Sequence, residues 1–92
     1  MADTSRDRWK HSRRVAWRKV ADEAVILDVE TATYYSLRGA GMRMWELLGS
    51  GKPASEIARS LAEEFDAPEP RIAADCSKLA GKLVKERLLE RA

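Results

Sequence analysis

The sequence is poor in the residues that build metal sites and covalent active sites. Its 92 residues include one cysteine, Cys76, and one histidine, His11. A single cysteine excludes an internal disulfide, and the distance between the two residues in sequence leaves no cluster of metal ligands. Nucleophilic catalysis through Cys76 would need a nearby base, and no glycine-rich phosphate loop or pair of clustered carboxylates is present. We therefore predict no metal, no cofactor and no catalytic residues.

Long apolar runs are also missing. No stretch is long enough to span a bilayer, and residues 1–14 carry charges without the apolar core or cleavage site of a signal peptide. A length of 92 residues suffices for one modest hydrophobic core. We expect a single folded domain in the cytoplasm, without membrane contact.

Charge is distributed unevenly along the chain. Residues 1–19 have a net charge of +5, from seven Lys or Arg and two acids, whereas the remainder has a net charge of −3, from ten basic and thirteen acidic residues. A charged terminus of this kind is commonly solvated and poorly ordered. We expect residues 1–14 to form a basic, flexible arm in which Trp9 is exposed, and residues 15–92 to form the folded domain.

Three segments have the pattern of β-strands. Residues 15–20 alternate in polarity, and residues 24–30 are almost continuously apolar through Leu27, as in a strand covered on both sides at one end. In residues 33–38, Tyr35 and Leu37 share one face while Tyr34 and Ser36 share the other. These segments predict a three-stranded antiparallel sheet. Residues 30–33 lack the Gly or Asn typical of tight turns, which leaves the turn type and the adjacent register open.

After residue 41 the apolar period changes to that of helices. Met42, Trp45 and Leu48 are three apart, which predicts a short helix that ends at Gly49-Ser50-Gly51, with glycine in a left-handed C-cap. Two longer helices should start near Pro53 and near Pro70. Their apolar stripes are Ile57, Leu61 and Phe65 in the first and Ile72, Cys76, Leu79 and Leu83 in the second. Leu88 and Leu89 are expected to pack against the sheet.

Three strands followed by three helices predict an α+β domain in which the helices cover one face of a small antiparallel sheet, like a winged helix whose wing strands come first. At this point the sequence resembles a known family. The run VILDVETATYYSLRGAGMRMWELLGSGKPASEIARSLAEEF, followed by residues 75–89, resembles PqqD-like proteins, also described as recognition elements for the leader segments of ribosomally made and modified (RiPP) peptides. Features that match the family pattern are residues 25–27, Tyr35 with Leu37, Gly41, Met44-Trp45, Glu56-Ile57 and Asp75.

Two positions depart from the family pattern. Arg38 stands where the family usually has Asn, and Arg87 stands where a Gly commonly precedes the closing Leu-Leu pair. The loop after the third strand and the end of the last helix are therefore expected to differ from those of the family.

The resemblance implies a non-catalytic protein that binds the leader segment of a precursor peptide by β-strand addition, at the free edge of the third strand and beside the third helix. The peptide-binding residues that it implies are Tyr34, Tyr35, Ser36, Leu37 and Arg38 on the strand and Asp75, Lys78, Leu79 and Lys82 on the helix. It also implies a peptide-modifying enzyme as partner, such as a radical-SAM protein or a leader protease, in a lasso-peptide, pyrroloquinoline-quinone or other pathway.

Several of these residues also fit a structural role. Large apolar residues at regular spacing usually pack inward, which applies to Tyr35, Leu37 and Leu79, whereas Tyr34 lies on the opposite face of its strand. The lysines at 78, 82 and 85 could attract an acidic leader or could form the solvated side of an amphipathic helix.

Two other functions fit the predicted fold. A winged helix could bind DNA, with the basic arm along the phosphates. Acidic residues crowd the second helix and the turn after it, where phosphates would have to approach: Glu56, Glu63, Glu64, Asp66 and Glu69. This negative charge opposes DNA binding, so we expect no nucleic acid partner. A plain scaffold without a peptide groove is the third possibility.

Overall fold

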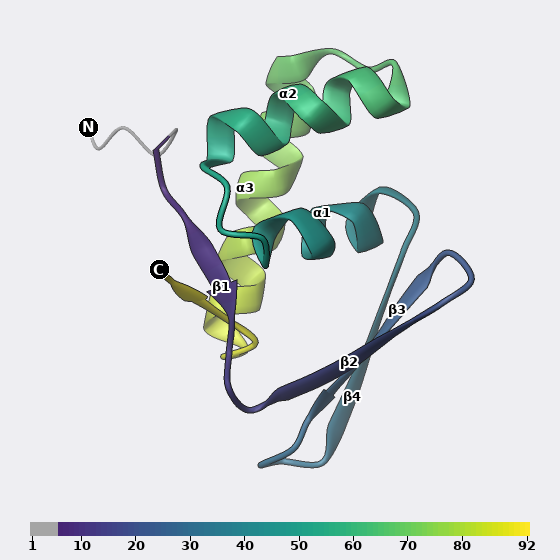
Figure 1. Cartoon of the computed structure of the whole chain (residues 1–92), viewed down its shortest axis with the longest axis vertical. Coiled ribbons are helices and arrows are strands. Elements are labelled where there is room, and N and C mark those ends of the chain that lie inside the picture. The colour runs from purple at the N-terminus through teal and green to yellow at the C-terminus, as the bar shows by residue number, and fades with distance from the viewer. Residues whose placement is uncertain (1–5) are drawn as a thin grey trace.

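The predicted order of three sheet strands followed by three helices is present in the computed structural model, which describes residues 6–92. The elements, shown in Figure 1, are β1 (Trp9–His11), β2 (Val15–Val20), β3 (Glu23–Asp28), β4 (Thr33–Arg38), α1 (Ala40–Leu48), α2 (Ala54–Phe65), α3 (Glu69–Lys85) and β5 (Leu89–Arg91). The fold class is α+β, as predicted. Two short strands, β1 and β5, were not expected.

The three-stranded sheet has the order β2-β3-β4 and is antiparallel throughout. Its central strand, β3, buries Ala24 and Ile26 on one face, while Val25 and Leu27 on the other face are only half-buried. The prediction of a strand covered on both sides is therefore wrong, because only one face of the sheet packs against the body of the protein. β3 also ends earlier than predicted, at Asp28 rather than at residue 30.

Both turns of the sheet use alanine where glycine or asparagine is common. Ala21 has a φ of 57° and Ala32 a φ of 56°. The second turn is also held by the carboxylate of Asp28, whose Oδ1 accepts the backbone N–H of Glu30 at 3.0 Å and of Thr31 at 3.3 Å. Such a turn of the Asx type ends β3 without a glycine.

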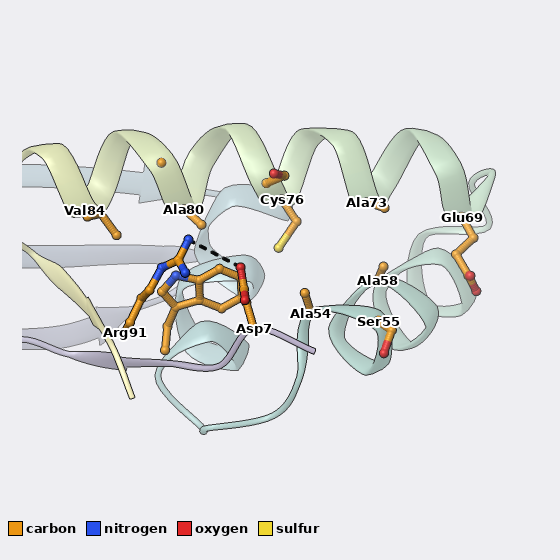
Figure 2. Close-up of a pocket in the computed structure, with 13 residues that line it drawn as sticks. Asp7, Ala54, Ser55, Ala58, Glu69, Ala73, Cys76, Ala80, Val84 and Arg91 are labelled. Carbon is orange, nitrogen blue, oxygen red and sulfur yellow. Dashed lines mark ion pairs between the residues drawn. The ribbon is translucent and has the colours of Figure 1, made fainter. Parts of the chain in front are cut away.

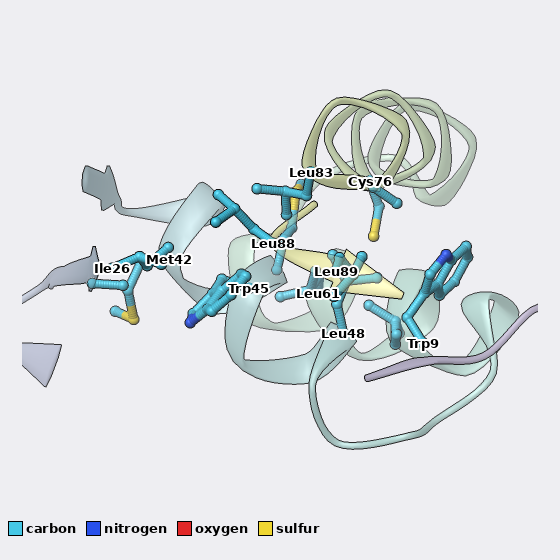
Figure 3. Packing of buried hydrophobic residues seen from close by; sticks show 14 of the residues in the cluster. Trp9, Ile26, Met42, Trp45, Leu48, Leu61, Cys76, Leu83, Leu88 and Leu89 are labelled. Atoms are coloured by element: carbon cyan, nitrogen blue, oxygen red, sulfur yellow. The ribbon is translucent and has the colours of Figure 1, made fainter. Parts of the chain in front are cut away.

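The hydrophobic core lies between the helices, β1 and β5, and reaches the sheet at Ile26. Trp45 and Leu48 of α1 are fully buried, as are Ile57 and Leu61 of α2. Figure 3 shows Trp45, Leu48 and Leu61 near Leu83 and Cys76 of α3, with Leu88 and Leu89 between them. The sequence-based roles of Trp45 as scaffold and of Cys76 as a buried small apolar residue are confirmed.

The expected flexible arm does not extend over residues 9–11. These residues form β1, which pairs antiparallel with β5 in the register Trp9↔Arg91 to His11↔Leu89. Trp9 is 7% exposed, so the expectation that it lies in solvent is wrong, since its large apolar ring packs in the core beside Cys76 (Figure 3). Leu89 belongs to β5 and thus pairs with β1 rather than with the three-stranded sheet. Residues 1–5 of the predicted arm lie outside the described residues.

The end of α1 corrects the predicted role of Gly49. Its φ is −75°, in the right-handed region, and Gly51 is the residue with positive φ, at 83°. A Cβ atom on Gly49 would overlap the ring of His11. That ring stacks on Trp45 with 3.7 Å between ring centroids, and its Nε2 lies 2.9 Å from the carbonyl oxygen of Trp45. Gly49 is therefore needed because His11 approaches the helix end closely.

Candidate functional site

The strand β4 forms one edge of the three-stranded sheet. Within residues 6–92, its strand partner is β3 alone. Just beyond the strand, the N–H of Gly39 donates to the carbonyl oxygen of Asp22 at 3.3 Å. Hydrogen-bonded pairs alternate along an antiparallel ladder, so the backbone groups of Tyr35 and Leu37 point toward β3. The N–H and C=O groups of the alternate residues point to the free edge: Tyr34, Ser36 and Arg38.

Side chains of β4 divide between the two faces of the sheet as predicted. Tyr35 and Leu37 are half-buried and pack against the core. Tyr34 is 69% exposed on the opposite face, which it shares with Ser36 and Arg38. The guanidinium of Arg38 forms an ion pair with Glu23, the residue opposite it on β3.

A hydrogen bond joins β4 to the C-terminal end of α3. The hydroxyl of Tyr35 donates to Oε2 of Glu86, the residue that caps α3, at 3.3 Å. Burial and the negative charge of Glu86 raise the pKa of Tyr35 above its usual value, so the phenol keeps its proton as the donor. This contact brings the third sheet strand and the last helix together on one side of the molecule.

Three of the four predicted site residues of α3 lie on its outer side. Asp75, Lys78 and Lys82 are exposed, whereas Leu79 is half-buried and packs against the core cluster that Tyr35 also contacts. In the described part of the chain, no hydrogen bond or ion pair joins these three charged side chains to β4. The structure therefore brings Leu79 and Tyr35 to one core and leaves the charged residues open to solvent.

A buried ion pair, missed in the sequence, holds the far end of β4 in place. Asp28 is 2% exposed and accepts hydrogen bonds from Nε of Arg14 at 3.0 and 3.1 Å, with Nη2 of Arg14 also 3.0 Å away. The hydrogen bond from Arg14 holds the pKa of Asp28 below its usual value. Because the same carboxylate accepts two N–H groups of the β3–β4 turn, Arg14 fixes the start of β4. No pattern in the sequence indicates this role, since Arg14 stands within a basic stretch.

The other edge of the sheet, on β2, also has outward backbone groups, and β2 differs from β4 in what packs against its inner face. The N–H of Val29 donates to the carbonyl oxygen of Arg14 at 2.8 Å, and the same alternation then points the backbone groups of Trp17 and Lys19 outward. The ring of Trp17 packs edge-on against Trp45, with 6.0 Å between centroids. Side chains of the protein itself therefore fill the space beside the inner face of β2.

A cavity of about 520 Å³ lies between α2, α3 and the β1–β5 pair (Figure 2). Its α3 wall is formed by Ala73, Cys76, Ala80 and Val84, on the opposite side of the helix from Lys78. None of the predicted peptide-binding residues lines it. Burial raises the pKa of the Cys76 thiol to about 11, so the thiol is a poor nucleophile near neutral pH. The sequence did not predict this cavity, because its small side chains come from elements far apart in the chain.

The described residues give no sign of a metal site or a membrane span. No group of three His, Cys, Asp or Glu side chains in residues 6–92 is arranged to hold a metal ion. Across the same residues, none of the helices combines the length and the apolar character that crossing a bilayer requires.

Two solved structures have the same fold as this chain. One, "TbiB1 in Complex with the TbiA(beta) Leader Peptide", is 33% identical, with a TM-score of 0.82, and the match covers 88% of this chain and 94% of that one. The other, "Lasso peptide synthetase B1 complexed with the leader peptide", is 16% identical, with a TM-score of 0.81 and coverage of 89% and 96%. At that identity it shows the fold alone. Nothing in these matches supports the DNA-binding alternative.

Sequence comparison gives a family match but no single relative. No curated protein matches this chain. The sequence model of the family described as "Coenzyme PQQ synthesis protein D (PqqD)" matches residues 23–89, which include the whole of β3, β4 and the three helices. The chain belongs to the PqqD family.

Proposed function

We propose that this protein binds the leader segment of a ribosomally made precursor peptide and presents it to a modifying enzyme, without catalysing a reaction itself. The observation that carries the proposal is the free edge of β4, which has three outward N–H and three outward C=O groups. The hydrogen bond between Tyr35 and Glu86 joins this strand to the end of α3. The leader-peptide complexes of TbiB1 and of lasso peptide synthetase B1, which share this fold, support it.

Binding at this edge would follow from backbone chemistry. An extended guest would exchange hydrogen bonds with Tyr34, Ser36 and Arg38, each contributing about 1 kcal/mol net. Side chains of an extended chain alternate between two faces, so every second guest side chain would lie on the face of Tyr35 and Leu37 and point toward α3. On that side the guest would meet the remaining proposed contacts: Asp75, Lys78, Leu79 and Lys82. The other guest side chains would lie beside Tyr34.

The chemical step belongs, in this proposal, to a partner enzyme. A radical-SAM protein or a leader protease would act on the core of the precursor while its leader stays bound to β4. Both proteins would act in the cytoplasm, where the precursor is synthesised. The pathway could yield a lasso peptide, pyrroloquinoline quinone or another modified peptide.

Proline substitutions at the two sheet edges test the proposal. Proline at Ser36 removes an N–H that points to the free edge and leaves the β3–β4 hydrogen bonds intact. We expect Ser36→Pro to weaken binding of the leader peptide at least tenfold in isothermal titration calorimetry, since it loses a donor and places a ring where the guest would lie. The probe is a synthetic leader from the precursor gene nearest to the gene of this protein, and the TbiA(beta) leader peptide is the second probe.

Lys19→Pro is the matched control, because the N–H of Lys19 points to the free edge of β2. This variant should bind the leader within about twofold of the unchanged protein. Ser36→Ala, which keeps the N–H, separates the backbone from the side chain. Equal binding by Ser36→Pro and the unchanged protein, or a loss in Lys19→Pro alone, would refute capture at β4.

A further inference from the structure

Three lysines lie on the exposed side of α3: Lys78, Lys82 and Lys85. In the part of the chain that the structure describes, none of the three forms an ion pair. By contrast, Lys10 and Lys19 each reach a glutamate, at 3.8 and 3.9 Å. The charges on α3 are thus available to a molecule other than the protein itself.

The contact between Tyr35 and Glu86 shows which of these lysines face β4. Lys78, Lys82 and Glu86 are spaced four residues apart, and residues at this spacing lie on one side of a helix. Because Glu86 accepts a hydrogen bond from the hydroxyl of Tyr35, that side is turned toward β4. Lys78 and Lys82 are therefore placed along the wall of the proposed groove.

Acidic residues limit this basic segment at both ends. Asp75 is exposed one turn before Lys78, and Glu86 follows Lys82 by one turn. A carboxylate of the guest would be attracted to the two lysines and repelled at either end of them. The charge pattern thus favours acidic guest residues over a short length only.

The spacing of the lysines matches the repeat of an extended chain. Four helical residues rise about 6 Å, and every second residue of a strand advances about 6.7 Å. A guest strand that runs along α3 would therefore bring two acidic side chains at alternate positions to Lys78 and Lys82 together, and the length of the lysine side chains accommodates the small difference. We propose that the guest is an acidic peptide segment with Asp or Glu at two alternate positions that face α3. This inference rests on the proposed function.

The helix dipole explains only part of this lysine row. Lys82 and Lys85 lie in the last turn of α3, where positive charge stabilises the C-terminal end of a helix. Lys78 lies before the last turn, so the dipole does not account for it. Lys78 is for this reason the more informative residue to change.

A pair of matched peptides tests the inference. One is a leader peptide with Glu at two alternate positions, and the other carries Gln at the same positions, which keeps size and removes charge. The unchanged protein should bind the Glu peptide about fivefold more tightly at low salt, since each exposed ion pair contributes modestly. The preference should shrink when salt is raised toward 1 M, where the screening length falls to about 3 Å.

Variants of α3 assign the preference to the two lysines. In the double variant Lys78→Glu and Lys82→Glu the preference should reverse, so that the Gln peptide binds more tightly. The single variant Lys78→Gln should reduce the preference for the Glu peptide. Lys52→Glu, which changes an exposed lysine between α1 and α2, is the control and should keep the preference. Melting curves confirm that each variant is folded.

The outcomes separate this inference from the proposed function. If both peptides bound equally and Ser36→Pro still weakened their binding at least tenfold, the acidic guest would be overturned and capture at β4 would stand. Binding of neither peptide by the unchanged protein, or binding that Ser36→Pro does not affect, would overturn capture at β4. A preference that persists in the double variant would also contradict the inference, because it would arise elsewhere on the protein.

Discussion

The β1–β5 pair and the β2–β3–β4 sheet lie on different sides of the helices and differ in what their strands bury (Figure 1). The pair has only three residues in each strand, yet Trp9 and Leu89 are both buried. In the larger sheet, neither β2 nor β4 has a buried residue, and burial is confined to β3. We infer from this contrast that the short pair serves mainly the stability of the fold, whereas the larger sheet has two edge strands whose backbone groups are available for binding.

Replacing Trp9 tests the stabilising role of the short pair and should have the largest effect. Trp9→Ala removes a buried aromatic ring, so the free energy of unfolding should fall by about 3 kcal/mol. Trp17→Ala is the matched control, because Trp17 of β2 is 37% exposed, and this change should cost about 1 kcal/mol. Urea unfolding followed by circular dichroism measures both. A loss below that of Trp17→Ala would contradict the proposed division of roles.

Protonation of Asp28 should weaken the larger sheet at acidic pH. Because Arg14 lowers the pKa of Asp28 in the folded protein, the stabilisation is present above the unfolded pKa of about 4 and is lost as pH falls through the folded pKa. Asp28→Asn should therefore lower the melting temperature at pH 7 and make it vary less between pH 5 and pH 2. Arginines also lower the pKa of Glu23 and Glu64, which leaves some pH dependence in the variant.

The control for this pH dependence is Asp75→Asn, which changes an exposed acid on α3. It should keep the pH dependence of the unchanged protein. If acidification lowered the melting temperature of the Asp28→Asn variant as much as that of the unchanged protein, the ion pair with Arg14 would not stabilise the sheet as described.

The smallest effect is expected at Arg87, where α3 turns into β5. Arg87 has a φ of 63°, and the N–H groups of Arg87 and Leu88 donate to the carbonyls of Val84 and Leu83, at 3.0 and 2.9 Å. This arrangement is a Schellman motif, in which glycine is favoured at the left-handed position. Arg87→Gly should raise the free energy of unfolding by about 0.5 to 1 kcal/mol, whereas Arg87→Ala, which keeps the strained φ, should give no gain. Thermal unfolding compares the two, and an equal gain from alanine would exclude backbone strain as the cause.

The sequence predicted those parts of the fold that local periodicity determines. Alternation located residues 15–20 and 33–38 as strands with the same bounds as β2 and β4. The helical period located most of the buried residues of the three helices, but the prediction that Phe65 packs in the core is wrong: Phe65 ends α2 and is 41% exposed, because no element within residues 6–92 covers that end of the stripe. The family departure at Arg87 falls on the residue with positive φ at the end of α3, and the expected difference from the helix end of the family stays a prediction.

The sequence could not predict the β1–β5 pair or the cavity beside it. A strand of three residues is too short to show alternation, and Trp9 stands in a basic stretch typical of a tail. Its partner strand lies about eighty residues away, so no local pattern connects the two. Likewise, the proposed site residues could be named from the resemblance, but which backbone groups of β4 face outward follows only from the strand order and the hydrogen bonds.

Amide hydrogen exchange of β4 tests the capture of a peptide at its edge most directly. In the free protein, the outward N–H groups of Tyr34, Ser36 and Arg38 should exchange rapidly, while those of Tyr35 and Leu37, which bond to β3, exchange slowly. With a leader peptide bound, the three outward groups should slow by about tenfold or more, and the outward groups of β2 should not change. Unchanged exchange at Tyr34, Ser36 and Arg38, with protection instead on β2 or around the cavity between α2 and α3, would contradict the account.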